Sequence, residues 1–123
     1  MTRIQLESLL EERYGVSGES LWAEYPSYSV FRHKDNRKWF AVIMSIPRIK
    51  LEPGNQGRID VVNLKCPPKE SLLLQEHPGI FPAYHMHKGL WISVALDGRV
   101  EASLLEALLE TSFWLTGEKK QHK

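Results

Sequence analysis

The sequence contains little cysteine and no long apolar run. Its single cysteine, Cys66, excludes an internal disulfide and a zinc ribbon built from cysteines. Because Cys66 stands directly before two prolines, with no base evident beside it, we expect a small, buried and unreactive residue there. No apolar stretch approaches the ~20 residues that a membrane-spanning helix requires. A disulfide-stapled fold is therefore excluded, and no membrane partner is expected.

Catalytic and phosphate-binding motifs are also missing. The chain contains no Walker motif, no G-x-G-x-x-G loop, no nucleophile elbow and no H-E-x-x-H helix. The first fifteen residues form an acidic amphipathic segment rather than a signal peptide, so we expect a cytoplasmic protein. The formal net charge of +1 falls short of the basic balance of a typical nucleic-acid binder, so only the distribution of charge is informative.

The composition is that of an ordinary soluble domain. Hydrophobic residues make up 42% of the 123 positions and charged residues 25%, and this length is sufficient for one core. We expect residues 1–117 to form a single α+β domain. The last six residues, EKKQHK, follow Gly117 and are expected to be a mobile tail.

Hydrophobic periodicity predicts the order helix, three strands, helix, two strands, helix. Leucines at helical spacing predict the first helix at 2–14, which Thr2 could cap and Gly15 would end. The expected strands cover residues 28–33, 38–46, 58–64, 83–88 and 91–96, and the remaining helices residues 69–76 and 101–115. The fold class is α+β, an antiparallel sheet of about five strands with both terminal helices packed on one face.

The stretch from His77 to Gly98 has the densest mixture of turn signals and alternating residues. Its prolines predict an irregular crossing over 77–82. Beyond it, Gly89 lies between the last two expected strands and would allow a tight hairpin at 88–90. An Asp-Gly turn then ends the second of these strands.

His85 and His87 would share one face of the expected strand 83–88, which is the spacing of a metal-binding pair. Further ligands are missing from the neighbourhood, so we expect two solvent-facing histidines and no cofactor. Ser112 lies inside the last helix, where a serine commonly bonds the carbonyl one turn back. Neither feature predicts catalysis.

The run PAYHMHKGLWISVALDGRV, followed by a terminal helix that ends LLETSFWL, resembles the MmcQ/YjbR family of small bacterial proteins. The residues that carry the resemblance are Lys88, Trp91, Asp97, Gly98, Ser112 and Phe113, together with Leu64-Lys65 at a strand end. His87 stands where the family often has asparagine. The resemblance implies a frataxin-like (CyaY-like) fold and a presumed DNA-binding function.

Charge is segregated along the chain. The segment 32–38 has four cations against one carboxylate, a local charge of +3, and the loop 48–58 has three cations against one carboxylate, a charge of +2. The last helix has three glutamates and no cation between them, a charge of −3. If both helices cover one face of the sheet, the other face is expected to be open and basic.

These observations favour a non-enzymatic binding module that binds DNA. The expected phosphate contacts are Arg32, Lys34, Arg37, Lys38, Arg48, Lys50, Arg58 and Lys88, and Trp39 and Trp91 are candidates for base stacking. One alternative is a protein-interaction adaptor, as a monomer or weak dimer. Another is a metal-dependent enzyme that uses His85 and His87.

Overall fold

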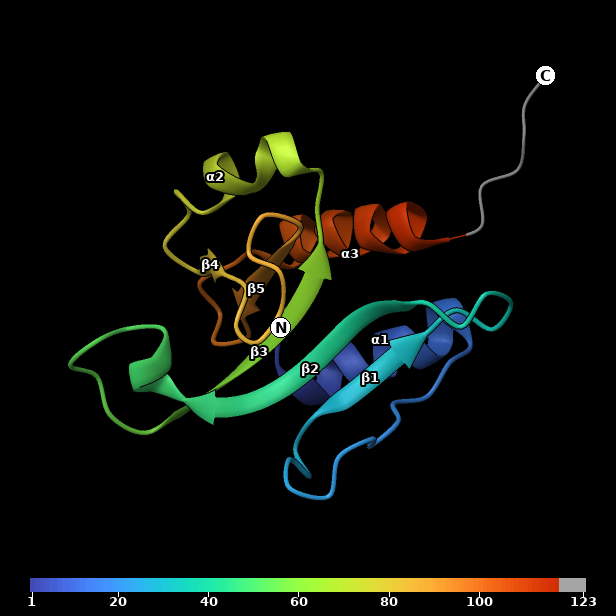
Figure 1. Cartoon of the computed structure of the whole chain (residues 1–123), viewed down its shortest axis with the longest axis horizontal. Helices are drawn as coiled ribbons and strands as arrows, with labels where there is room; N and C mark the ends of the chain where they lie inside the picture. The colour runs from blue at the N-terminus through green and yellow to red at the C-terminus, as the bar shows by residue number, and fades with distance from the viewer. Residues whose placement is uncertain (118–123) are drawn as a thin grey trace.

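The computed structural model describes residues 1–117, so the expected tail at 118–123 lies outside the described residues. Five strands form one antiparallel sheet in the order β1-β2-β3-β5-β4 (Figure 1). The strands are β1 (Ser29–Arg32), β2 (Trp39–Pro47), β3 (Arg58–Lys65), β4 (Ile80–Pro82) and β5 (Trp91–Ala95). The helices are α1 (Arg3–Tyr14), α2 (Ser71–Leu74) and α3 (Ala102–Thr116), with 3-10 turns η1 (Arg48–Lys50) and η2 (Pro68–Glu70).

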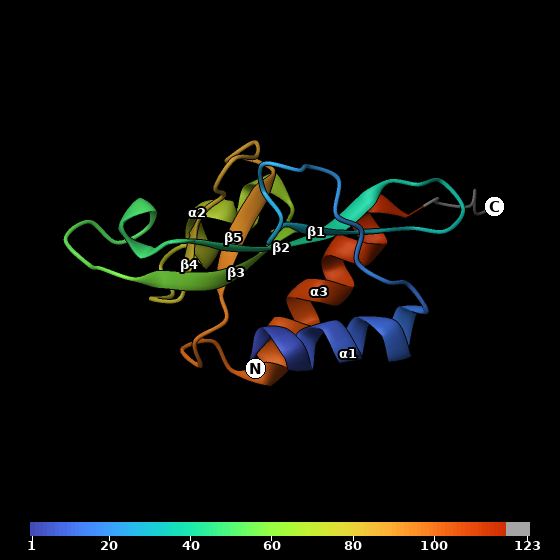
Figure 2. The ribbon, with the colours of Figure 1, turned by 90° about the horizontal axis from the view of Figure 1, so that it is seen from below.

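Both long helices, α1 and α3, cover the same face of the sheet (Figure 2). Leu6 and Leu10 of α1 and Leu105 and Leu109 of α3 are fully or almost fully buried against inward-facing strand residues such as Val62. Burial of these apolar side chains is the main force that holds the helices on the sheet. The predicted α+β class, the element order and the placement of the terminal helices are confirmed.

The first helix begins and ends as its sequence predicts. The Thr2 side chain accepts a hydrogen bond from the Gln5 amide, and the Gln5 side chain accepts one from the Thr2 amide, which makes a reciprocal cap. Gly15 ends the helix with a φ of 66°, a left-handed conformation in which a Cβ would be strained.

Ser112 has a different role from the one that its position in a helix suggests. Its hydroxyl donates to the Phe40 carbonyl of β2 at 2.6 Å and accepts from the Lys65 amide of β3 at 2.8 Å. The expected bond to a carbonyl one turn back is therefore replaced by a clamp that joins α3 to the two central strands. One buried hydroxyl satisfies two backbone groups at the end of the sheet.

The prediction of a strand over 83–88 was wrong. The edge strand beside β5 is β4, which covers three residues of the stretch expected to be irregular. Pro82 is tolerated there because β4 is an edge strand, where one amide has no ladder partner to lose. Residues 83–90 form a loop in place of the expected tight hairpin, and its left-handed residue is His85, with a φ of 63°, rather than Gly89.

Candidate functional site

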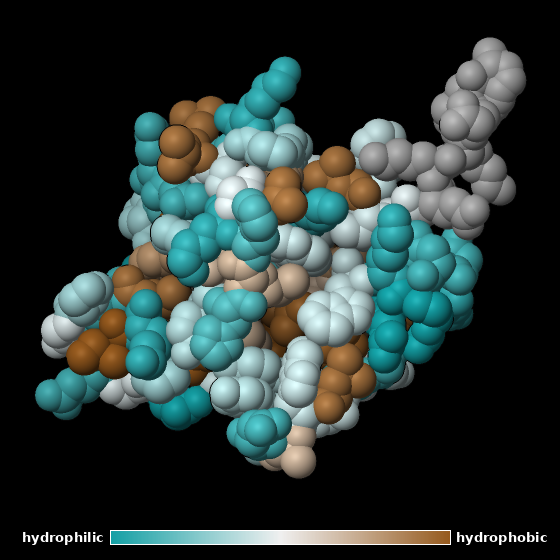
Figure 3. All heavy atoms as spheres, viewed as in Figure 1, coloured by the Kyte–Doolittle hydropathy of each residue, from teal (hydrophilic) through white to brown (hydrophobic). Residues whose placement is uncertain are grey.

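The face of the sheet opposite the helices is not the open basic surface that the sequence suggested. Two segments, 19–28 and the loop 83–90, pass over it (Figure 2). Side chains of these segments and of β2 line an open pocket of about 330 Å³. We call this hollow the aromatic pocket. It is lined by Trp22, Tyr25, Tyr28, Trp39, Val42, Met44, His85 and Met86. Figure 3 shows this face, with hydrophobic side chains at the bottom of a hollow between paler residues.

The first wall of the pocket is segment 19–28, which is tied to the sheet by polar contacts. Glu19 and Val30 exchange both backbone hydrogen bonds at 2.9 Å, so the segment starts beside β1. At its other end, the Ser27 hydroxyl donates to the Ser45 carbonyl at 3.2 Å. Between these ties, the Tyr28 amide donates to the Tyr25 carbonyl at 3.1 Å and closes a turn. The segment thereby holds its aromatic rings over β2.

The second wall is the loop 83–90, which is held by a buried polar pair. Asn63 of β3 and Ser93 of β5 are both fully buried, and the Ser93 hydroxyl donates to the Asn63 side-chain carbonyl. Asn63 donates to the Tyr84 carbonyl and Ser93 accepts from the Tyr84 amide, each at 2.9 Å. Both polar groups of the Tyr84 backbone are therefore satisfied by the sheet, which fixes where the loop crosses it.

The rings of the site form a continuous series across this face. Trp22 meets Trp39 and Tyr28 edge to face, with centroids 5.7 and 5.9 Å apart. Tyr25 stacks on Tyr28 at 4.7 Å, and the ring of His85 lies close to both of these tyrosines. Trp22 and Tyr25 are partly or largely exposed, so the pocket presents aromatic surface to solvent. Such surface can stack a flat ring or receive a cation.

A groove adjoins the aromatic pocket and shares Tyr25 and Tyr28 with it. Arg58 lines this groove, and its guanidinium donates to the Ser45 hydroxyl at 3.1 Å and to the Ser45 carbonyl at 2.7 Å. Burial raises the pKa of Tyr28, and the neighbouring rings of Tyr84 and Tyr25 act in the same direction, although Arg58 opposes them. The Tyr28 hydroxyl thus stays protonated at neutral pH.

Several cations expected to contact phosphate already have partners. Arg32 pairs with Glu19 at 2.9 Å, and Arg37 reaches the same carboxylate at 3.6 Å. The Lys88 ammonium donates to the Ala83 carbonyl at 2.7 Å, which closes the loop 83–90 on itself. A phosphate would have to compete with these contacts.

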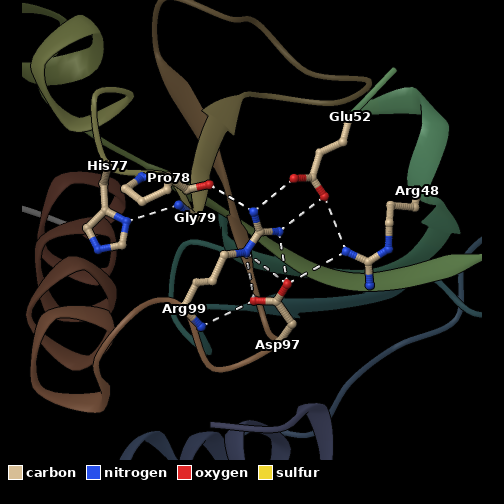
Figure 4. A network of polar contacts seen from close by, with 7 residues as sticks. All are labelled: Arg48, Glu52, His77, Pro78, Gly79, Asp97 and Arg99. Atoms are coloured by element: carbon tan, nitrogen blue, oxygen red, sulfur yellow. Dashed lines mark hydrogen bonds and ion pairs between the residues drawn. The ribbon is translucent and has the colours of Figure 1, made fainter. Parts of the chain in front are cut away.

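Arg48 belongs to a four-membered ion-pair network at the far end of β2 (Figure 4). It pairs with Glu52 at 3.2 Å and with Asp97 at 3.7 Å, and Arg99 pairs with the same two carboxylates at 2.9 Å. Hydrogen bonds from Arg99 lower the pKa of Glu52, and they also lower that of Asp97 against the opposing effect of its burial. The network fastens the β2–β3 loop to the turn before α3.

The remaining candidates do not converge on one surface. Lys34 and Lys38 are exposed in the β1–β2 hairpin, whereas Lys50 is exposed in the loop at the opposite end of β2 (Figure 1). Trp39 lines the aromatic pocket, while Trp91 lies half-buried at the start of β5 and is not part of that lining. The residues of the predicted site therefore lie in separate places: some at either end of β2, and others in or near the aromatic pocket.

His85 and His87 do not share a strand face, because neither belongs to a strand. The His85 ring stacks on Tyr84 at 4.0 Å, and Nδ1 of His87 accepts from the Gly89 amide at 3.1 Å. Within residues 1–117, no group of three His, Cys, Asp or Glu side chains is placed to hold a metal ion. The described helices also include none that is long and apolar enough to cross a bilayer. Cys66 is buried as expected, and burial raises the pKa of its thiol.

The residues that build the pocket were mostly missed from sequence. Trp22, Tyr25 and Tyr28 lie three positions apart in a segment that has neither helical nor strand periodicity, so the sequence indicates an aromatic-rich loop but not the direction of its rings. Asn63 interrupts an apolar strand, and such a buried amide requires partners. Both signals were present in the sequence, although neither shows which loop supplies the opposite wall.

A five-stranded antiparallel sheet, with two helices on one face and an aromatic pocket on the other, defines a class of small α+β domains. The chain belongs to the YjbR family, whose model matches residues 11–115. The predicted resemblance is thereby confirmed.

Two of the relatives match over almost their whole length. The uncharacterised protein YyaQ of Bacillus subtilis is 40% identical over 94% of this chain and 98% of its own. A crystal structure of a Pseudomonas syringae protein is 41% identical, with a TM-score of 0.93 over 95% of this chain and all of the other. A Deinococcus radiodurans protein with the domain DUF419 is 28% identical, with a TM-score of 0.72 over 99% of this chain and 83% of the other. These matches establish family and fold, while the likeness to frataxin stays a prediction.

Proposed function

We propose that the protein is a non-enzymatic DNA-binding module that contacts phosphates through its β1–β2 hairpin. The observation that supports this most is the anchoring of the hairpin. The Asn36 side chain donates to the Thr116 carbonyl at 3.0 Å, and the buried His33 ring bonds the Thr116 hydroxyl at 2.8 Å. The hairpin tip is thus pinned to the end of α3, and its cations are held together at one end of the domain.

The charge available at this tip is smaller than the sequence count but remains positive. Lys34 and Lys38 are exposed and form no ion pair with a carboxylate among residues 1–117. The Arg37 side chain is 57% exposed, and its one ion pair among the described residues is the 3.6 Å contact with Glu19. Figure 3 shows strongly hydrophilic residues gathered over this hairpin. Clustered exposed cations of this kind release counterions when they meet phosphate.

The hairpin is tested by titrating a fluorescent duplex and a single strand with wild type and with the double variant K34Q/K38Q. We expect wild-type affinity to fall steeply with salt, and the variant to bind more weakly with a salt slope smaller by about two. Lys69→Gln, an exposed lysine on η2, is the matched control and should bind like wild type. No binding at low salt, or equal binding by the double variant and the control, would reject the proposal.

A second candidate is the binding of another protein through α2. Leu72 and Leu73 are adjacent on this short helix and are 79% and 66% exposed. Large neighbouring apolar residues are uncommon on a free surface and are typical of contact sites. If α2 is such a site, a partner isolated after nuclease treatment should be retained by wild type and lost by L72S/L73S. A partner retained equally by both proteins would exclude α2.

A further inference from the structure

Two hollows meet on the helix-free face of the sheet. The aromatic pocket and the groove beside it have Tyr25 and Tyr28 in common, and Arg58 stands in the groove. A ligand that fills the pocket can therefore extend past these two rings and reach the guanidinium. The two hollows together can receive a group of mixed character, apolar at one end and charged at the other.

The aromatic pocket fits a flat ring system. Its volume of about 330 Å³ is at the lower end of the ~300–1,000 Å³ typical of small-molecule sites. Trp22 and Trp39 border it, and Val42 and Met44 of β2 contribute buried apolar surface. Rings and a thioether of this kind stack on any heteroaromatic group without requiring a particular hydrogen-bond pattern.

Arg58 adds a preference for an anion. A guanidinium has five N–H donors, and the two bonds to Ser45 leave donors that no residue of 1–117 engages. Ser45 also fixes the orientation of the fork, which favours planar recognition of a phosphate or carboxylate. Glu24 lines the same groove, and both Glu24 and Arg58 are exposed, so solvent and salt screen both charges. The preference for an anion rests on the donors of Arg58, which Ser45 holds in place.

We propose that the pocket and the groove together bind a planar heteroaromatic ring that carries a phosphate, as a nucleotide does. The ring would enter among Trp22, Tyr28 and Trp39, and the phosphate would meet Arg58. A methylated ammonium ion, the usual guest of an aromatic cage, fits less well because Arg58 would repel it and no described carboxylate lines the pocket. This inference goes beyond the hairpin proposal and uses other residues, so either can fail alone.

The first test follows the indole N–H signals of the full chain by NMR during titration with AMP. The signals of Trp22 and Trp39 should shift saturably, while that of Trp114 should not. Adenosine should bind about tenfold more weakly because it cannot form the charge-assisted bonds, and inorganic phosphate alone should leave both indoles unshifted. The absence of shifts at Trp22 and Trp39 with millimolar AMP and with a single-stranded oligonucleotide would overturn the proposal.

Matched variants separate the two halves of the site. Trp22→Ala should weaken AMP binding about tenfold or more through lost stacking, and Arg58→Gln should make AMP bind no better than adenosine. Arg58 is exposed, so its substitution leaves folding intact, and Arg13→Gln on α1 is the control. AMP affinity that Arg58→Gln leaves unchanged would also overturn the proposal.

The source of the nucleotide is decided by comparing AMP with a single-stranded oligonucleotide. If AMP shifts the Trp22 and Trp39 signals as much as the oligonucleotide does, the free nucleotide is sufficient and the site is assigned to it. If only the oligonucleotide shifts these signals, the site is assigned to an unpaired base of a strand. Either result supports the same ring-and-phosphate chemistry. In K34Q/K38Q the AMP response should persist even if duplex binding is lost, which keeps the two proposals distinguishable.

Discussion

On one face of the sheet, leucines of α1 and α3 such as Leu6 and Leu109 pack with the buried rings of Phe31 and Phe40 in one apolar cluster. On the other face, loops cross the sheet, several aromatic rings stay partly exposed, and a hollow remains. The backbone of a helix forms its hydrogen bonds within the helix, so the side chains that a helix packs on the sheet can be apolar. The backbone of a loop requires hydrogen-bond partners from elsewhere. Here the side chains of Asn63 and Ser93 in the sheet bond the Tyr84 backbone of the loop 83–90.

This difference suggests a division of labour between the two faces. We expect the helix-covered face to provide most of the stability, because it has the larger cluster of buried apolar side chains. The loop-covered face keeps exposed rings and unengaged donors, which contribute less to stability and are suited to binding a ligand. Sites commonly lie on loops that a rigid scaffold positions.

The largest expected effect is on the helix-covered face. Leu109→Ala should lower the free energy of unfolding by about 2–5 kcal/mol, since it leaves a cavity in a fully buried site. Trp22→Ala, which removes a larger but half-buried side chain, should cost roughly 1–2 kcal/mol. Urea denaturation followed by circular dichroism measures both values. A greater loss of unfolding free energy for Trp22→Ala than for Leu109→Ala would contradict the proposal that the helix-covered face provides most of the stability.

Two buried serines allow the comparison to be sharpened with the same substitution. Ser93→Ala leaves the Tyr84 amide and the Asn63 carbonyl without their partner, and Ser112→Ala does the same to the Phe40 carbonyl and the Lys65 amide. Each should cost about 1–3 kcal/mol, which is the penalty for an unsatisfied buried group.

The two serine variants should differ in where protection is lost. Hydrogen exchange should accelerate at the Tyr84 amide in Ser93→Ala and at the Lys65 amide in Ser112→Ala. Ser103→Ala, on the exposed side of α3, is the control and should stay within about 0.5 kcal/mol of wild type. Accelerated exchange at both amides in either variant would mean that the faces unfold as one unit.

The sequence carried enough information for the helix-covered face but not for the other. The span of α1 followed from leucine spacing, Thr2 and Gly15, which are local signals. The alternation at 83–88 looked like a strand because Tyr84 and Met86 do pack on the sheet. The Tyr84 backbone, however, bonds to the side chains of Asn63 and Ser93 rather than to the backbone of a neighbouring strand, and a local pattern cannot distinguish these two arrangements.

The same limit explains the candidate cations. Counting charges along the chain gave two basic segments, but some of the carboxylates that pair with those cations lie outside the counted segments. Glu19 reaches Arg32 across thirteen positions, and Asp97 reaches Arg48 from the turn before α3. Only Trp39, of the residues expected to stack bases, was found in the pocket. Ion pairs between distant segments are set by topology, so they emerge only from the folded chain.

The smallest expected effect concerns a polar group on the helix-covered side. His33 is 5% exposed, packs against Phe40 and Phe113, and bonds the Thr116 hydroxyl, whose own proton goes to the Ser112 carbonyl. Since a hydroxyl has one proton, this geometry leaves the Thr116 oxygen to accept a hydrogen bond from Nε2 of His33. Burial lowers the pKa of His33, and the charge of Lys38 acts in the same direction. Asp35 and a backbone hydrogen bond at Phe113 oppose this shift.

The pKa of His33 is therefore lower in the folded chain than in the unfolded chain, where a histidine has a pKa of ~6.5. Protonation of His33 at acid pH thus favours the unfolded chain. The contribution of His33 to stability should be complete above about pH 7.5 and should decline as the pH falls through ~6.5 toward the lower pKa of the folded state. His33→Gln should flatten this part of the profile of unfolding free energy against pH. Parallel profiles for wild type and His33→Gln between pH 7.5 and 5.5 would contradict this prediction. They would show that the buried His33 ring can be protonated without disturbing the hairpin anchor. The helix-covered face would then tolerate a charge as readily as the face with the pocket.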